Sequence, residues 1–250
     1  MNLVLELENV VRVSGAYTNE FFKQCNVKQL TKSKLREIVI NFFPITQSFA
    51  LSGFAYCDTV CKLIENKNYN NSIIKENNLE DFLAKVIEII SDEFNINHIN
   101  KSENFHYNVF SRLAKKLDIK SEKLKNGEYS VHQETFDLAS NLTRNFRSGS
   151  IVGGLANIFV IEYTAINIIN CLWDCFAVQK DTYDNPLFNE YELEHITLHQ
   201  ILEIGHNYEA HQLFNFINCD KNTVNELNAL CSELSGNLGK YWMRLLLDEE

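Results

Sequence analysis

The stretch IVGGLANIFVIEYTAINIINCLWDCF, residues 151–176, is apolar on nearly every side over about seven helical turns. A helix of that kind lies either in a membrane or in the core of a large helical protein. A membrane span of about 20 residues rarely carries many polar groups. This stretch has several, and therefore predicts a buried central helix of a soluble bundle: Asn157, Glu162, Asn167, Asn170 and Asp174.

The rest of the chain predicts further helices around this one. Only 2 prolines and 9 glycines occur in 250 residues, so turn signals are sparse. One helix is expected after Thr31 as N-cap, kinked or ended by Pro44. Others are expected over 18–26, 46–65, 78–94, 103–117, 135–146, 188–217 and 223–247. Apart from a weak strand pattern in LVLEL near the start, the sequence predicts an all-α bundle of about seven to nine helices, one domain over residues 1–250.

Charge and cysteine content narrow the class of protein. The net charge of −10 argues against nucleic acid as a partner, because an acidic surface repels phosphate. No basic region precedes an apolar run at the N-terminus, so we expect a cytoplasmic protein without a membrane partner. The 7 cysteines lack the spacing of a secreted scaffold. Cys57/Cys61 and Cys171/Cys175, each four residues apart, are interpreted as reduced core thiols.

Four of the 7 histidines fall in LEHITLHQILEIGHNYEAHQLF, residues 193–214. A helix advances about 100° per residue, so Glu203 stands about 40° from His199, and His206 about 20° to the other side. These three side chains therefore share one stripe of the helix. His195 falls near the same stripe, one turn earlier, and His211 falls off it. Such a stripe is either a set of ordinary polar residues or one side of a metal site.

A carboxylate in an apolar setting favours the metal site. Glu162 lies in the middle of IFVIEYTAI, where an ionised side chain costs several kcal/mol unless something compensates it. A metal ion is one compensation. A basic partner is the other, and Arg144 or Arg147 could supply it.

Further donors lie between residues 88 and 117. Glu93 ends one expected helix and His106 begins the next, with Glu103 three residues before it. Glu103 and His106 form E-x-x-H, as do Glu203 and His206, and two such motifs on different helices are typical of di-iron carboxylate bundles. The alternatives are a solvated helix-end acid for Glu93 and a dipole-stabilising N-terminal acid for Glu103.

The sequence resembles the haem-oxygenase-like di-iron oxidases and oxygenases, whose superfamily also holds TenA-like and PqqC-like proteins. The resemblance spans roughly residues 28–206. It rests on QLTKSKLREIVINFF, on SDEF followed by FHYNVFSRLAKKLDI, on IFVIEYTAI, and most specifically on LHQILEIGH. It implies a haem-oxygenase-like helical bundle.

Carried over by position, the resemblance implies six metal ligands. They are Glu93 and His106 for one iron, Glu162 as the bridge, and His199, Glu203 and His206 for the second iron. The gap between Glu93 and His106 is longer than the family pattern, which makes Glu103 the substitute for Glu93. The family also often has Asp where this chain has Glu203.

The implied function is a non-haem di-iron oxidoreductase of small-molecule biosynthesis. Two Fe(II) ions, with manganese as the alternative metal, would activate dioxygen as co-substrate. The substrate would be a small organic molecule such as an amine or amino acid. Glu162, His199 and Glu203 would form the catalytic centre. The resemblance leaves room for an external reductant and, by analogy of fold, for a homodimer.

Four other functions share this fold class or composition. A TenA-like hydrolase would use a cysteine nucleophile, for which Cys171 or Cys175 are the nearest candidates, and a PqqC-like oxidase would need no metal. A haem oxygenase would need a proximal histidine on an early helix, and this chain has none before His98. A non-catalytic helical binding protein would retain the histidine and glutamate donors as a degenerate metal site and would catalyse no reaction.

Overall fold

The computed structural model describes residues 3–25, 29–65, 73–75, 78–92, 106–180 and 185–246. These residues form ten α-helices and one short 3-10 helix, and no β-strand is found among them. The elements are α1 (Leu3–Val13), α2 (Glu20–Cys25), α3 (Lys32–Glu65), α4 (Leu79–Asp92), α5 (His106–Lys116), α6 (Ser121–Lys125), α7 (Gln133–Arg147), α8 (Ile151–Phe176), α9 (Glu190–Leu213), η1 (Phe214–Phe216) and α10 (Lys221–Arg244). The prediction of an all-α bundle is confirmed.

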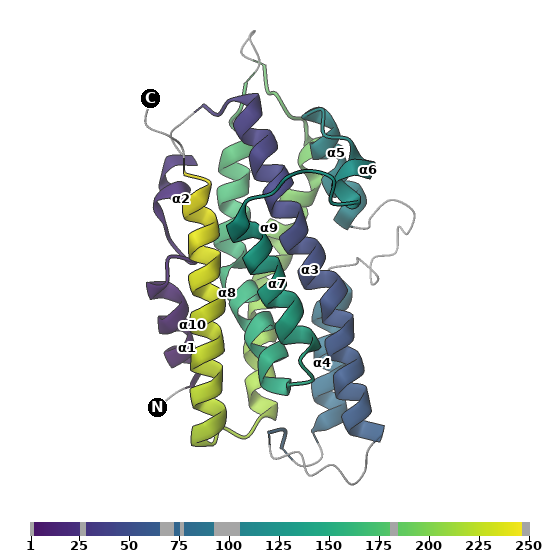
Figure 1. Ribbon diagram of the computed structural model, residues 1–250, viewed down its shortest axis with the longest axis vertical. Coiled ribbons are helices and arrows are strands. Elements are labelled where there is room, and N and C mark those ends of the chain that lie inside the picture. Colours follow the sequence, from purple (N-terminus) through teal and green to yellow (C-terminus); the bar gives the residue numbers. More distant parts are fainter. Residues whose placement is uncertain are drawn as a thin grey trace.

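Helix α8 is the central helix of the bundle. The long helices run alongside one another (Figure 1), and α8 contacts α2, α3, α7, α9 and α10. Helices α3 and α8 are both long and apolar enough to cross a membrane by length and composition alone, but 83% of the apolar window of α8 is buried inside the bundle. The interpretation of residues 151–176 as a buried core helix is confirmed.

The polar groups of α8 are accommodated by partners on neighbouring elements. Ser150 caps the helix, because its side chain accepts a hydrogen bond from the backbone N–H of Gly153. Asn157 is fully buried, donates to the carbonyl of Leu142 at 2.7 Å and accepts from Asn145 at 3.0 Å. A buried amide that is hydrogen-bonded on both sides costs the core little.

Of the two alternatives expected at Pro44, a kink or the end of the helix, the end does not occur in α3. The helix begins after Thr31, whose hydroxyl accepts from the N–H of Lys34 at 3.2 Å, so the predicted N-cap is confirmed. It then continues through Pro44 to Glu65 as one helix instead of ending. Interior proline costs about 3 kcal/mol. Burial of each large apolar side chain contributes about 1.5–3 kcal/mol, and three flank the proline: Phe42, Phe43 and Ile45.

The N-terminal stretch is helical, although its sequence weakly suggested a strand. LVLEL lies in residues 3–13, which form α1. Leu7 and Val11, four residues apart, are both fully buried, and that spacing places them on one face of a helix. The short helix α6 was not predicted either. Helices α1 and α6 are added to the expected set, whereas the helices expected after Thr31 and over 46–65 are a single helix, α3.

A capping box fixes the start of α9. The side chain of Asn189 accepts from the N–H of Glu192, and the side chain of Glu192 accepts from the N–H of Asn189. We expect Asn189→Ala to lower the free energy of unfolding by about 1 kcal/mol, because a helix N–H loses its acceptor. Urea denaturation measures this loss. Asn189→Asp, which keeps an acceptor oxygen, should stay close to the parent; equal losses in both variants would contradict the capping role.

Candidate metal centre

Helix α9 buries polar side chains and exposes apolar ones. Ile201 and Ile204 are 75% and 72% exposed. The hydrophobic effect favours the opposite arrangement, and a buried carboxylate costs several kcal/mol unless it is compensated. The inner stripe of the helix must therefore meet groups that stabilise it. The residues of this stripe, each 3–4% exposed, are His195, His199, Glu203 and His206.

The stripe of α9 meets Glu162, which projects from α8 and is 1% exposed. Nδ1 of His206 lies 3.6 Å from a carboxylate oxygen of Glu162 and 3.6 Å from Oε2 of Glu203. Nδ1 of His199 lies 2.5 Å from Oε1 of Glu203, and here the imidazole N–H donates to the carboxylate. One ligand atom from each of Glu162, Glu203 and His206 lies within 4.8 Å of the other two.

Arg144 does not supply the basic partner that the sequence offered for Glu162. Its guanidinium lies 2.7 Å from the carboxylate of Glu233, on α10. Arg147, the other candidate, is exposed at the end of α7. Arg144, although close to Glu162 in sequence, therefore forms an ion pair between α7 and α10.

Two of the six expected ligands are not placed by the structure. His106 begins α5, but its side chain lies outside the described residues. Glu93 and its substitute Glu103 also fall outside them. The structure thus brings together Glu162, Glu203 and His206, and places His199 in contact with Glu203.

Two histidines favour the ionised form of Glu203. Burial alone raises the pKa of this carboxyl group. The contacts with His199 and His206 outweigh burial and lower the pKa to about 2. The group is therefore a carboxylate at neutral pH, held by imidazoles on both sides.

The chemistry of the donor set fits a hard to borderline metal ion. Oε2 of Glu203 is buried and accepts no hydrogen bond within the described part of the chain. A buried anionic oxygen without a hydrogen bond costs free energy, and a bound cation would remove that cost. Mixed carboxylate and imidazole donors suit iron or manganese.

His195 belongs to the site although it was not among the expected ligands. Its ring centroid lies 4.7 Å from that of His199, and its ring meets the edge of Phe110 at 5.4 Å. The four-residue spacing from His199 was the available signal. His211 lies away from the site, as the helical spacing predicted, with Nε2 3.5 Å from the carboxylate of Glu8.

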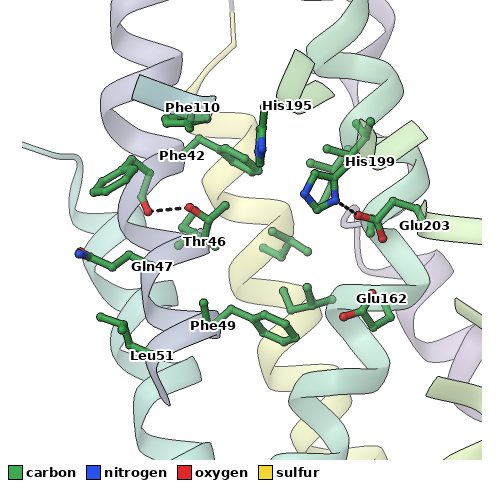
Figure 2. A pocket seen from close by; sticks show the side chains of 18 of the residues that line it. Phe42, Thr46, Gln47, Phe49, Leu51, Phe110, Glu162, His195, His199 and Glu203 are labelled. Atoms are coloured by element: carbon green, nitrogen blue, oxygen red, sulfur yellow. Dashed lines mark hydrogen bonds and ion pairs between the residues drawn. The ribbon is translucent and has the colours of Figure 1, made fainter. Parts of the chain in front are cut away.

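A cavity of about 460 Å³ adjoins this cluster, within the usual size range for a small-molecule site. Figure 2 shows the polar groups of α8 and α9 on one side of the cavity and side chains of α3 on the other. Leu51 and Lys125 are exposed and mark the mouth. The deeper wall is apolar and includes Phe42, Phe49, Ile161, Ala165 and Ile169.

The fold is that of the TenA and haem-oxygenase-like helical proteins, as the sequence resemblance implied. A crystal structure of a TenA homolog from Pseudomonas syringae pv. tomato str. DC3000 matches with a TM-score of 0.70, over 98% of this chain and 92% of that one. The two sequences are 13% identical, so the likeness concerns the fold alone. No family model matches the sequence. No curated protein matches it either.

Proposed function

We propose that this protein is a non-haem di-iron oxidoreductase that uses dioxygen to oxidise a small, mainly apolar substrate. One observation carries the proposal: two buried carboxylates and a buried imidazole converge at the inner end of an apolar cavity. A structural core has no need for such a group of polar atoms, whereas an oxidative metal site requires both the donors and the dry chamber beside them.

Glu162, Glu203 and His206 would hold one metal ion, and His199 would complete its set. The family resemblance adds Glu93 and His106 for a second ion, with Glu162 shared. When bound, ferrous ions supply the electrons and the open coordination positions that dioxygen reduction needs. Manganese is the alternative metal for these donors.

The protein's own side chains prepare the site in three ways. The carboxylates of Glu162 and Glu203 offset cationic charge in the core. The hydrogen bond from Nδ1 of His199 orients the Glu203 carboxylate and leaves Nε2 of His199 for the metal ion. Phe42 and Phe49 give the α3 side of the cavity an apolar wall, and an apolar site that excludes water limits side reactions.

The lining of the cavity constrains the substrate. Among the described residues that line it, Lys125 at the mouth is the only one with a lysine or arginine charge. A free amino acid would bring two charged groups into this wall, and burying charge without partners is costly. An amine or carboxylate with an aliphatic or aromatic body is the better match.

The proposal is tested by loading the full chain anaerobically with Fe(II) and measuring bound metal after removal of free iron. Two iron ions per chain are expected. A pulse of dioxygen should then consume dioxygen in step with oxidation of a suitable substrate. A chain that retains no iron would end the proposal and favour a metal-free enzyme or a binding protein on the same fold.

A cysteine-dependent hydrolase receives less support from the described residues. Neither Cys171 nor Cys175 is among the residues that line the cavity. Burial raises the pKa of both thiols, which disfavours the thiolate that a nucleophile must form.

We expect Ala165→Phe to separate substrate binding from metal binding. Ala165 lies one turn after Glu162 on α8 and lines the cavity, so a phenyl ring there would occupy the space for substrate. Iron content should be retained while substrate-dependent consumption of dioxygen is lost. Metal analysis and an oxygen electrode measure the two properties.

The matched control for this variant is Ala229→Phe, the same substitution at an exposed position of α10. It should keep both properties. If Ala165→Phe oxidises substrate at the parental rate, the cavity is not the substrate site.

A further inference from the structure

Three buried cysteines meet at a second place in the bundle. Cys25 ends α2, and Cys171 and Cys175 lie one turn apart on α8. Their sulfur atoms all lie within 4.8 Å of one another, and the thiol of Cys175 donates to the sulfur of Cys25 at 2.8 Å. All three are free thiols, exposed by 3% or less.

We propose that Cys25, Cys171 and Cys175 form a binding site for one soft metal ion, Cu(I), separate from the proposed iron centre. The sequence pattern identified only the pair on α8. Two cysteines four residues apart on one helix are expected as ordinary core residues. The third thiol comes from α2, 146 residues earlier than Cys171. Three converging sulfur donors in one enclosed place are the set that thiophilic metals select.

The composition of the cluster favours Cu(I) over Zn(II). Structural zinc sites are almost always four-coordinate. Among the His, Cys, Asp and Glu side chains that the structure describes, the group of potential ligands at this place consists of the three cysteines. Cu(I) is a softer ion than Zn(II), so it is the better match for three sulfur donors.

The distances allow one ion to contact all three sulfurs. Metal–sulfur bonds of about 2.3 Å place the sulfur ligands of one ion about 4 Å apart. The three sulfur atoms already lie within 4.8 Å of one another, a range that includes this value. The 2.8 Å contact between Cys25 and Cys175 would open by about 1 Å, a displacement that side-chain rotation supplies.

The site does not depend on the proposed oxidase function. Cys171 follows Glu162 by nine residues on α8, which is about 13 Å along the helix axis. The two sites can therefore be loaded and tested one at a time, and one can fail while the other stands.

The test uses the full chain carrying Cys219→Ser, which removes the exposed thiol. Reduced, iron-free protein is titrated anaerobically with Cu(I) against a chromophoric copper chelator. One Cu(I) per chain is expected. X-ray absorption at the copper edge should show a shell of three sulfur atoms, which binding at scattered thiols would not give.

Variants decide whether these cysteines are the ligands. Cys25→Ser, at the end of a short helix, and Cys171→Ser should each weaken Cu(I) binding by about tenfold or more. Cys231→Ser, which changes a buried thiol outside the cluster, should leave it unchanged. Circular dichroism shows whether each variant is folded. If Cys171→Ser does not fold, Cys25→Ser alone provides the test.

Three outcomes would overturn the inference. The first is that no Cu(I) binds in competition with the chelator. The second is that binding is equal in Cys25→Ser and Cys231→Ser. The third is tighter binding of Zn(II), with nitrogen or oxygen atoms in its ligand shell.

Discussion

Glu203→Gln is expected to lower iron affinity by at least about 100-fold, because it removes the carboxylate that contacts both His199 and His206. The substitution keeps the shape of the side chain, so the bundle should still fold. Iron content after anaerobic loading and dialysis measures the loss. Thermal denaturation provides a second measure, since a ligand stabilises only a protein that binds it.

The matched control is Glu190→Gln, which removes a carboxylate from an exposed position in the first turn of the same helix. This variant should bind iron as the parent does. If the two variants retain iron equally, Glu203 is not a ligand, and the charge on α9 must have a structural purpose.

Trp242→Ala should produce the largest loss of stability, about 3–5 kcal/mol. Trp242 lies on α10, is fully buried, and its ring lies 5.6 Å from that of Phe21, 5.1 Å from Phe22 and 6.2 Å from Phe42. Removing the indole leaves a cavity where α2, α3 and α10 meet. Urea denaturation should show the loss, with a fall in melting temperature of roughly 6–20 °C.

Met243→Ala is the control for this variant, because Met243 is adjacent in sequence but 45% exposed. Its effect should stay within about 0.5 kcal/mol. A loss below about 1 kcal/mol for Trp242→Ala would mean that the aromatic cluster is not a main contributor to the stability of the bundle.

The central helix and the polar stripe could be predicted because each is a local pattern. An apolar run such as residues 151–176 is long enough to be distinguished from a strand. The angles between His199, Glu203 and His206 follow from helix geometry alone. The distances from those side chains to Glu162 cannot be predicted in this way, because they depend on how α8 and α9 pack.

The misses have the same physical origin. The helix continues through Pro44 because the adjacent Phe42 and Phe43 pack against Phe110 and Trp242, which are distant in sequence. LVLEL is too short for its period to separate strand from helix. Arg144 was close to Glu162 in sequence but points to Glu233 in the bundle. The cavity and the place of Cys25 beside α8 are entirely tertiary features.

The position of His206 between two carboxylates also fixes how α8 and α9 slide against each other. A slip of one turn, about 5.4 Å, would in one direction bring Glu203 to the place of His206, so that a carboxylate would replace the imidazole beside Glu162. In the other direction Ala210 would take that place and set Glu162 against a methyl group. The axial alignment of these two helices is therefore specified by charge, whereas apolar faces alone would tolerate several relative positions.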